Sequence, residues 1–564
     1  MPPAAEPLPR DPAPAAIERL GRCTLDLSDG ALRLSFDGVE VIRQIGCPIR
    51  DADWRTVPVI ETTSERHRTG NTLRLDRRFQ TVDGTIDGRL SVVASTAGLT
   101  AKLTAELTLT ARRDVRVNRA GFVLLHPIAG VAGTALTVRH SDGSMETTRF
   151  PDLISPGQPV FDIAGLRHCV AGVDVTITME GETFEMEDQR NWTDASFKTY
   201  CRPLARPRPY TLAAGDIVRQ CLRIDVSGAA DRPPASVSMA TEARIPAILL
   251  AHDAALADHP GPVDLASLGV SGLLLRVDAA APELSRPIDA PVTLEIVADH
   301  AGQITSLASR CAAEGLRPRR VIALPRSYLA SHQPEGPWPT PTPADFISAA
   351  RAAFPGAGIG GGALTNFTEF NRCPPDPAAI DFASFGTTAI VHAADDRAVR
   401  ESLEALAAVF ASAEALARDR PLHLGLVAIA MRSNPYGSAV AENPDHLRLP
   451  MASDDPRQRT RFAAAWTIGA VAEAARAGVA SLAPAMTSGP IALGSSDAAW
   501  PIRDAVAALA ALSGKRVRIE GAPGGLIVLT APGRTIAANL GDAPASVAGH
   551  DLAPMDLAIF GDPA

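Results

Sequence analysis

The segment Gly358-Ile-Gly-Gly-Gly-Ala-Leu-Thr-Asn-Phe-Thr-Glu-Phe-Asn-Arg372 carries the clearest fold signal in this chain of 564 residues. Its first half is a short, apolar, glycine-rich run, which suits a strand buried in a crowded barrel. In its second half, Asn366, Glu369, Asn371 and Arg372 lie within seven positions. In α/β barrels the functional groups cluster at the carboxyl ends of parallel strands. We therefore expect a barrel strand that ends in a site for a polyhydroxylated ligand.

Seven more short apolar segments accompany this one and complete a repeating pattern. They cover residues 247–251, 272–277, 292–297, 320–324, 388–392, 422–429 and 478–484. Stretches with helical spacing, such as residues 301–314 and 397–418, lie between most of them, and the last predicted helix is residues 500–513. Eight strand and helix units over about 270 residues predict a (β/α)₈ TIM barrel.

The chain on both sides of the barrel has the pattern of β-structure. Between about residues 20 and 228, apolar and polar residues alternate and Asp-Gly turn signals recur, which predicts a large antiparallel β-sandwich. After Gly514, residues 516–520, 526–530, 535–539 and 557–560 read as short strands. The sequence therefore predicts an N-terminal β-sandwich domain (1–235), a barrel (240–513) and a small C-terminal β domain (514–564).

Composition excludes several classes of function. The chain is 46% hydrophobic and 21% charged, as in soluble globular proteins, and its net charge of −9 with no basic run argues against a nucleic-acid partner. No apolar run is long enough to span a membrane, and the N-terminus lacks the core of a signal peptide. The seven cysteines are scattered without a Cys-x-x-Cys pair, which predicts a cytoplasmic protein. Nothing in the sequence predicts an oligomeric state.

Two glutamates are the first catalytic candidates, because nearly every predicted strand ends in a polar residue and these two carry carboxylates. Glu295 interrupts the buried run 292–297, which is costly unless the side chain faces the barrel mouth with partners. Alternatively, Glu295 pairs with an arginine of a neighbouring strand and holds the barrel closed. Glu369 is either a catalytic group or a surface residue of a long loop. Two strand spacings separate their strands by roughly 10 Å, which leaves room for an attacking water.

Two other strand ends carry catalytic candidates. Arg432 begins the segment Arg-Ser-Asn-Pro-Tyr-Gly437, where it could stabilise an oxyanion or serve as an ordinary ion-pairing residue beside a turn that contains Tyr436. His392 ends the predicted sixth strand and precedes Asp395 by three residues, so it is either a general base held by that aspartate or a scaffold residue. No His-x-His or His-Glu-x-x-His pattern occurs, so we predict neither a metal nor a cofactor.

A fourth polar cluster lies outside the barrel, between residues 184 and 200. Its strand-like alternation breaks at Asp188, and polar residues then crowd around Trp192 and Phe197. One hypothesis is that this loop leans over the barrel mouth and binds substrate through Arg190, Asn191 and Asp194. The alternative is a domain interface that uses the same residues.

Three of these segments together resemble the signature segments of a known family. They are Glu187-Asp-Gln-Arg-Asn-Trp-Thr-Asp-Ala-Ser-Phe-Lys-Thr-Tyr200, Asn366-Phe-Thr-Glu-Phe-Asn-Arg372 and Arg432-Ser-Asn-Pro-Tyr-Gly437, and the family is that of the bacterial D-apionate lactonases. The resemblance covers essentially the whole chain and implies the same three-part layout. It also implies hydrolysis of D-apionolactone to D-apionate in the breakdown of the branched sugar D-apiose.

The candidate residues fit this chemistry, because opening a lactone needs an activated water, a stabilised oxyanion and a proton for the leaving alkoxide. Glu369 or Glu295 can serve as base and acid, and Arg432 or Asn366 can stabilise the oxyanion. Asn371, Arg372 and Tyr436 would bind the substrate. A glycoside hydrolase that uses the same carboxylate pair is the alternative, and a non-catalytic carbohydrate-binding protein is a third hypothesis. Aromatic residues make up only 4% of the chain, which does not favour a platform for stacking sugar rings.

Overall fold

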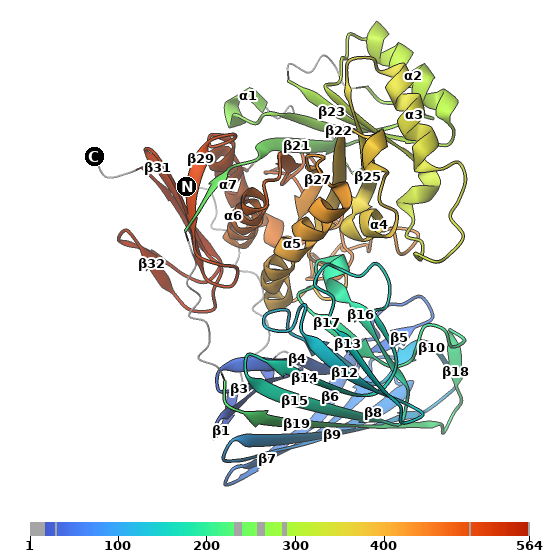
Figure 1. Cartoon of the computed structure of the whole chain (residues 1–564), viewed down its shortest axis with the longest axis vertical. Coiled ribbons are helices and arrows are strands. Elements are labelled where there is room, and N and C mark those ends of the chain that lie inside the picture. The colour runs from blue at the N-terminus through green and yellow to red at the C-terminus, as the bar shows by residue number, and fades with distance from the viewer. Residues whose placement is uncertain are drawn as a thin grey trace. The chain divides into compact units, whose positions relative to one another are not determined.

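The computed structural model describes residues 17–28, 31–230, 240–256, 265–284, 290–495 and 498–561 (Figure 1). These residues form two compact units. The first contains residues 17–189 and 196–230, and the second contains Arg190–Ala195 together with the described residues from 240 onward. The segment Arg190–Ala195 therefore groups with the barrel, although it is far from the barrel in sequence.

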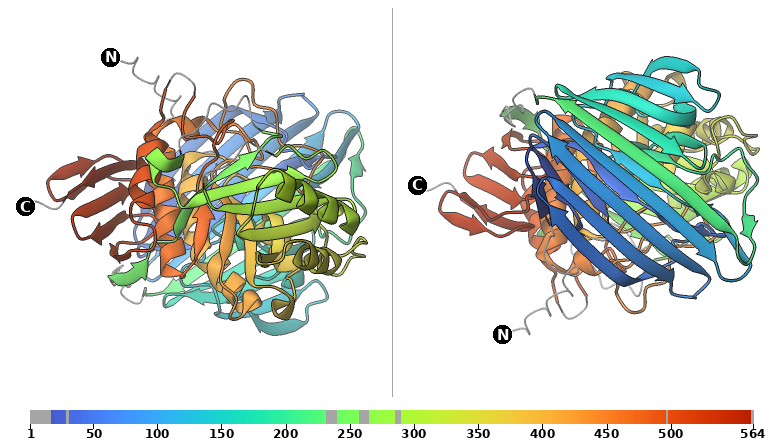
Figure 2. Two further views of the ribbon diagram at one scale, coloured as in Figure 1. Left: turned by 90° about the horizontal axis from the view of Figure 1, so that it is seen from above. Right: turned by 90° about the horizontal axis from the view of Figure 1, so that it is seen from below.

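The first unit is built mainly on one long, curled antiparallel sheet, whose long strands run side by side in the right-hand view of Figure 2. The order of its strands is β1 (Ile17–Leu20), β2 (Cys23–Asp26), β3 (Leu32–Phe36), β4 (Val39–Gly46), β11 (Val123–His126), β17 (Phe197–Tyr200), β16 (Phe184–Asp188), β14 (Val160–Val170), β15 (Val173–Glu180), β19 (Ile217–Gly228), β9 (Thr100–Ala111), β8 (Ile86–Ala97), β7 (Thr72–Thr81) and β6 (Val59–Thr69). The hairpin of β12 (Ala135–His140) and β13 (Met145–Arg149) pairs with β14. A second, three-stranded sheet consists of β18 (Tyr210–Leu212), β10 (Val115–Ala120) and β5 (Ile49–Asp51). The predicted all-β, antiparallel N-terminal domain is confirmed.

The second unit contains a closed barrel of parallel strands, as predicted. The strands are β21 (Ala247–Asp253), β22 (Gly272–Asp278), β23 (Val292–Ala298), β24 (Arg320–Pro325), β25 (Gly358–Asn366), β26 (Phe382–Thr388), β27 (His423–Ala428) and β28 (Ser481–Ala483). The helices are α1 (Leu265–Leu268), α2 (Ala301–Ala313), α3 (Pro343–Ala353), α4 (Phe367–Arg372), α5 (Asp396–Ala417), α6 (Arg461–Arg476) and α7 (Pro501–Ala510). The 3₁₀ turns η3 (Arg326–Leu329) and η5 (Pro456–Arg459) follow β24 and precede α6.

The glycines of β25 are required by the crowding inside the barrel. A Cβ added to Gly360 would lie 2.4 Å from the ring of Phe382, and one added to Gly362 would lie 2.0 Å from the carbonyl oxygen of Ser384. Gly362 also has a φ of 137°, a conformation that L side chains rarely adopt. Close approach of neighbouring backbones therefore explains the glycine-rich run.

The position predicted for the sixth strand was wrong. The strand is β26, Phe382–Thr388, and the predicted segment 388–392 lies at its end and in the loop that follows. Residues 382–388 are all buried, but they include Gly386, whose added Cβ would lie 2.7 Å from the carbonyl oxygen of Thr365. A strand rich in serine, threonine and glycine has a weaker apolar signal than the buried loop residues Ile390 and Val391. His392 consequently lies four residues beyond the strand.

The C-terminal residues form the small antiparallel sheet that the sequence predicts. Its order is β20 (Thr241–Arg244), β29 (Arg516–Glu520), β30 (Leu526–Ala531), β31 (Arg534–Asn539) and β34 (Asp556–Phe560), and β32 (Ala545–Val547) pairs with β33 (His550–Leu552). The sheet packs on α6 of the barrel (Figure 1). A Cβ at Gly469 of α6 would lie 2.7 Å from the side chain of Leu540. The sheet thus belongs to the barrel unit.

All seven cysteines are free thiols. Within the described ranges, every helix is too short or too polar to cross a membrane.

Candidate functional site

Four charged side chains meet at the mouth of the barrel and form what we call the charge network. Asp253 and Arg276 lie at or near the carboxyl ends of β21 and β22, Glu295 lies within β23, and Arg432 lies in the segment after β27. All four side chains are at most 11% exposed, and that of Glu295 is 2% exposed. Two cations and two anions are thus buried together, so their formal charges cancel.

The charge network is tightly hydrogen-bonded. Arg432 donates from Nε to Asp253 Oδ2 at 3.0 Å and from Nη1 to Glu295 Oε2 at 2.8 Å. Arg276 donates from Nε to Glu295 Oε2 at 3.0 Å, and its Nη1 lies 3.7 Å from Asp253 Oδ2. Burial would raise the pKa of Asp253, but the two guanidinium groups outweigh it and hold that pKa below its usual value. Glu295 therefore pairs with arginines, one of them on the neighbouring strand β22, as the alternative interpretation predicted, and its catalytic role stays a prediction.

A cavity of about 10 Å³, which we call the mouth cavity, adjoins the charge network. Its lining residues are Arg276, Glu295, Leu364, Thr365, Asn366, Gly386, Thr387, Gly425, Leu426, Arg432 and Ser433. Four buried polar atoms of these residues have no hydrogen-bond partner among the described residues: Asn366 Nδ2, Thr387 Oγ1, Arg432 Nη2 and Ser433 Oγ. Buried polar groups are almost always paired in proteins, so four unpaired ones among the residues that line one small cavity make it a candidate binding site.

Glu369 is buried, with 7% of its surface exposed, so the alternative of a surface loop residue is wrong. Its Oε2 accepts hydrogen bonds from Thr365 Oγ1 at 2.9 Å and from the backbone N–H of Asn366 at 3.1 Å, which caps the first turn of α4. Burial raises the pKa of this carboxyl. Glu369 lines a second small cavity with Tyr328 and Trp338, whereas Glu295 lines the mouth cavity.

The segment Arg190–Ala195 is bound to α4. The backbone carbonyl of Asn191 accepts from Thr368 Oγ1 at 2.7 Å, and its side-chain oxygen accepts from Asn371 Nδ2 at 3.1 Å. The guanidinium of Arg372 lies 5.2 Å from the ring centre of Trp192. These contacts hold the segment against the helix that follows directly from Asn366.

His392 joins the same segment through Asp194. Its Nδ1 donates to Asp194 Oδ2 at 2.6 Å, and the ring of Trp192 packs edge-on against the imidazole with centroids 5.5 Å apart. Nε2 makes no hydrogen bond to any described residue, and 24% of the side chain is exposed. The predicted partner, Asp395, was wrong: Asp395 caps α5 by accepting from the backbone N–H of Ala398 at 2.8 Å. An imidazole held by a carboxylate through Nδ1, with Nε2 free, is suited to accept a proton.

The other predicted binding residues are engaged within the protein. Arg372 donates to Ser331 Oγ at 3.0 Å and to the carbonyl of His332 at 3.3 Å. The phenol of Tyr436 donates to Thr368 Oγ1 at 3.1 Å, and burial raises its pKa well above the usual value. Arg190 is buried, with 1% of its surface exposed. The structure thus brings Glu295, Asn366 and Arg432 to one cavity, and the remaining candidates are not among the residues that line it.

Four residues of the site were not among the candidates chosen from the sequence: Asp253, Arg276, Thr387 and Ser433. The first two were visible as charged residues at predicted strand ends, which is the signal that could have selected them. Thr387 and Ser433 gave no signal, because serine and threonine occur throughout the chain. Among the described residues, no three His, Cys, Asp or Glu side chains are grouped as metal ligands would be.

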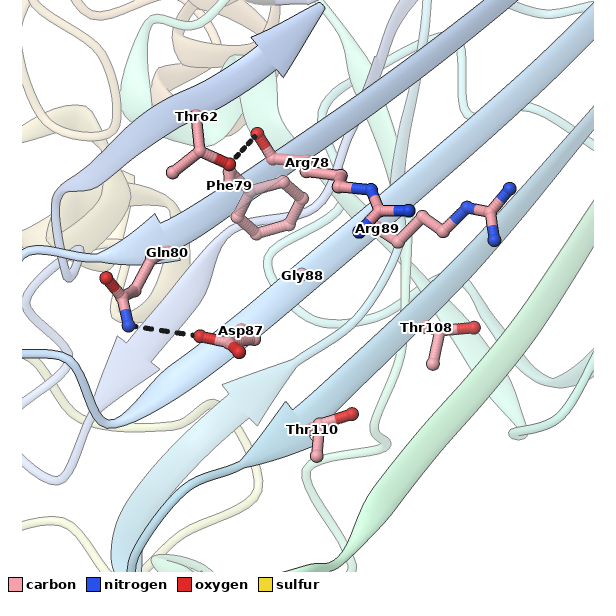
Figure 3. A pocket seen from close by; sticks show the side chains of 9 residues that line it. All are labelled: Thr62, Arg78, Phe79, Gln80, Asp87, Gly88, Arg89, Thr108 and Thr110. Atoms are coloured by element: carbon pink, nitrogen blue, oxygen red, sulfur yellow. Dashed lines mark hydrogen bonds between the residues drawn. The ribbon is translucent and has the colours of Figure 1, made fainter.

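A larger hollow of about 440 Å³ lies on the sheet of the first unit, over β6, β7, β8 and β9 (Figure 3). We call it the sheet groove, and its lining residues are Thr62, Arg78, Phe79, Gln80, Asp87, Gly88, Arg89, Thr108 and Thr110. Asp87 accepts from Gln80 Nε2 at 3.1 Å and also pairs with Arg112. The ring of Phe79 occupies the space in which a side chain at position 88 would lie.

Comparison with known proteins gives matches along most of the chain. Residues 7–229 match the family model described as D-apionate lactonase, N-terminal domain, and residues 247–514 match the one described as D-apionate lactonase, TIM barrel domain. A protein of Brucella anthropi, named D-apionate lactonase, is 35% identical over 506 residues, which cover 84% of this chain and 83% of that relative.

Solved structures give weaker matches. A GH30 endoxylanase from Clostridium papyrosolvens is 10% identical, with 58% of this chain and 98% of that chain covered and a TM-score of 0.37. A GH36 α-galactosidase from Geobacillus stearothermophilus is 8% identical, with 95% and 93% covered and a TM-score of 0.28. Both scores are too low to support a statement about this chain.

Proposed function

The chain belongs to the D-apionate lactonase family, and from that premise we propose that the mouth cavity is where the lactone ring is opened. The protein is a lactonase, a hydrolase of a cyclic ester. The substrate is D-apionolactone and the product is D-apionate. The observation that carries the assignment to this cavity is the group of unpaired buried donors among the residues that line it.

The mouth cavity is suited to hold the carbonyl oxygen of the lactone. Arg432 Nη2 and Asn366 Nδ2 can only donate, and the hydroxyls of Thr387 and Ser433 can donate as well. When water adds to the carbonyl carbon, this oxygen becomes an oxyanion, and fixed donors in a site that excludes water stabilise such a charge strongly. Arg432 is therefore the main hydrogen-bond donor that stabilises the oxyanion.

His392 is the general base in this proposal. It lies in the loop after β26, the strand that carries Thr387 of the mouth cavity. Nε2 takes a proton from the attacking water, whose oxygen bonds to the carbonyl carbon, and Asp194 holds the resulting imidazolium. The tetrahedral intermediate then collapses, the ring carbon–oxygen bond breaks, and His392 returns the proton to the leaving alkoxide.

The two glutamates have supporting tasks. Glu295 accepts hydrogen bonds from Arg432 and Arg276 through Oε2, so it positions the guanidinium that stabilises the oxyanion. Glu369 caps α4 and thereby fixes the backbone of Asn366, whose side chain lines the mouth cavity. Because the two carboxylates line different cavities, the geometry does not favour the paired-carboxylate chemistry of a glycosidase.

Residues that do not line the mouth cavity complete the site. We propose that Asn191, Asn371, Arg372 and Tyr436 hold the segment Arg190–Ala195 on α4, so that Asp194 stays in register with His392. The reaction uses neither metal nor cofactor. A cytoplasmic location is supported by the seven free thiols.

An assay of acid release tests this function. The protein is incubated with D-apionolactone, with other aldonolactones and, separately, with nitrophenyl glycosides, before and after treatment with EDTA. We expect acid release from D-apionolactone that EDTA does not change, and no nitrophenol. Glycoside turnover without lactone turnover would overturn the proposal, and activity that EDTA removes and Zn²⁺ restores would overturn the metal-free mechanism.

A further inference from the structure

We propose that the charge network makes the site select the neutral lactone over the anionic product, so that the product carboxylate is released easily. This inference rests on the proposed function of the mouth cavity. It assigns a task to Asp253 and Arg276 and a second one to Glu295, beyond holding Arg432 in place.

The substrate and the product differ in charge. The lactone carries no charge, whereas hydrolysis at neutral pH creates a carboxylate in the same place. A lone buried guanidinium beside that place would bind the product strongly, because arginine and carboxylate form short, charge-assisted hydrogen bonds. Here Asp253 and Glu295 cancel the charges of Arg276 and Arg432 within 3.7 Å. A carboxylate that enters meets a site with no net charge.

The hydrogen bonds of Arg432 also disfavour a bound carboxylate. Arginine holds a carboxylate best through two parallel hydrogen bonds from two nitrogen atoms. Arg432 has committed Nε to Asp253 and Nη1 to Glu295, and only Nη2 lacks a partner among the described residues. The mouth cavity is small, about 10 Å³, and can hold an oxygen atom beside Nη2. A carbonyl oxygen fits this arrangement, and a bidentate carboxylate does not.

Arg276 keeps the arrangement fixed. It donates to Glu295 Oε2 and to the backbone carbonyl of Leu364, and its Nη1 lies near Asp253. Glu295 therefore cannot follow Arg432 toward a ligand without losing its bond to Arg276. The two carboxylates hold Arg432 from two sides while Nη2 faces the substrate.

The test is product inhibition of the full-length enzyme. In Asp253→Asn, the amide oxygen still accepts from Arg432 Nε, but the network gains one net positive charge and the amide competes less for the guanidinium. We expect the inhibition constant of D-apionate to fall on the order of tenfold, with a much smaller change in KM for D-apionolactone. A substitution that only disturbed the structure would weaken the binding of D-apionate and would not strengthen it.

Glu473→Gln is the matched control. Glu473 is also a buried carboxylate paired with an arginine, Arg476, but both lie on α6 and outside the mouth cavity. We expect its inhibition constant for D-apionate to equal that of the wild type. An unchanged or weaker inhibition in folded Asp253→Asn would overturn the inference.

Two further measurements separate the possible failures. Glu295→Gln adds the same net charge and replaces Asp253→Asn if the latter does not fold. In the wild type, inhibition by D-apionate should depend only weakly on NaCl concentration, and a steep dependence would contradict a neutral site. If the wild type does not hydrolyse D-apionolactone, the proposed function itself fails. If it does hydrolyse the lactone but the variants bind product no better, only this inference fails.

Discussion

The sheet groove is much larger than the mouth cavity, yet we assign the function to the smaller of the two. The groove measures about 440 Å³ and the cavity about 10 Å³. In the groove, Asp87 is already bonded to Gln80 (Figure 3) and also to Arg112. In the cavity, four buried polar atoms have no partner among the described residues. We therefore placed the proposed site by its unsatisfied buried donors and not by its volume.

The charged residues of the sheet groove are exposed, whereas those of the charge network are buried. Arg78 and Arg89 of the groove lie directly opposite each other on β7 and β8, on the exposed face of the sheet. Water screens such surface charges, and their interactions contribute little. The charge network is buried, so removal of one member leaves another uncompensated, which is costly. Substitutions in the two regions should therefore have very different effects.

The largest effect is expected at Arg432. Arg432→Ala removes the donor that faces the carbonyl oxygen and should lower kcat/KM at least about 1000-fold, mostly through kcat. Arg432→Lys should recover little, because an ammonium cannot donate to Asp253, Glu295 and the substrate in the same geometry. Steady-state kinetics on D-apionolactone provide the measurement, with circular dichroism to confirm folding. A folded Arg432→Ala with a kcat within tenfold of the wild type would contradict the account.

The next largest effect is a loss of stability at low pH that arises from two buried histidines of the first, all-β unit. Burial lowers the pKa of His168 to about 4 and that of His126 to well below 6.5, so the folded protein keeps both imidazoles neutral. The folded state is therefore fully stable above pH 6.5. It loses stability as the pH falls from 6.5 toward about 4, because only the unfolded chain then binds the protons. We expect the free energy of unfolding to fall by roughly 3 kcal/mol between pH 6.5 and pH 4 because of His168.

Urea unfolding between pH 7 and pH 4 measures this loss, with intrinsic fluorescence and circular dichroism as probes. His168→Phe keeps an aromatic ring in the cluster with Phe150 and should flatten the pH dependence. Lactone turnover at pH 7 should stay within twofold. An equally steep pH dependence in the variant would exclude His168 as its source.

A smaller effect is expected at His392. His392→Gln should lower kcat about 100-fold, because glutamine cannot accept a proton. Asp194→Asn should lower kcat less, since it removes the charge that holds the imidazolium but keeps an oxygen acceptor. A folded His392→Gln that keeps the wild-type kcat would show that another residue is the general base, and Glu369 would be tested next.

The smallest effect is expected in the sheet groove. The double variant Arg78→Ala/Arg89→Ala changes two exposed side chains, and kcat/KM should change less than twofold. The same kinetic assay measures it beside Arg432→Ala. A loss as large as that of the barrel variants would break the distinction between the two regions.

The sequence predicted most of the fold, because period-two alternation and strand–helix repeats are local signals. It missed the bounds of β26, since Gly386 and the neighbouring threonines are buried by backbone crowding rather than by apolar side chains. Within the site, the capping of α4 by Glu369 was readable from the spacing of Asn366 and Glu369. The pair His392–Asp194 joins residues 198 positions apart, and no local pattern shows such a contact.

A crystal structure with an unreactive ring analogue, the lactam of D-apionic acid, would locate the substrate carbonyl directly. We expect its carbonyl oxygen in the mouth cavity, within hydrogen-bond distance of Arg432 Nη2 and Asn366 Nδ2, with His392 Nε2 facing the carbonyl carbon through a water. A lactam bound in the sheet groove, or one in the barrel with its carbonyl turned away from Arg432, would contradict this expectation.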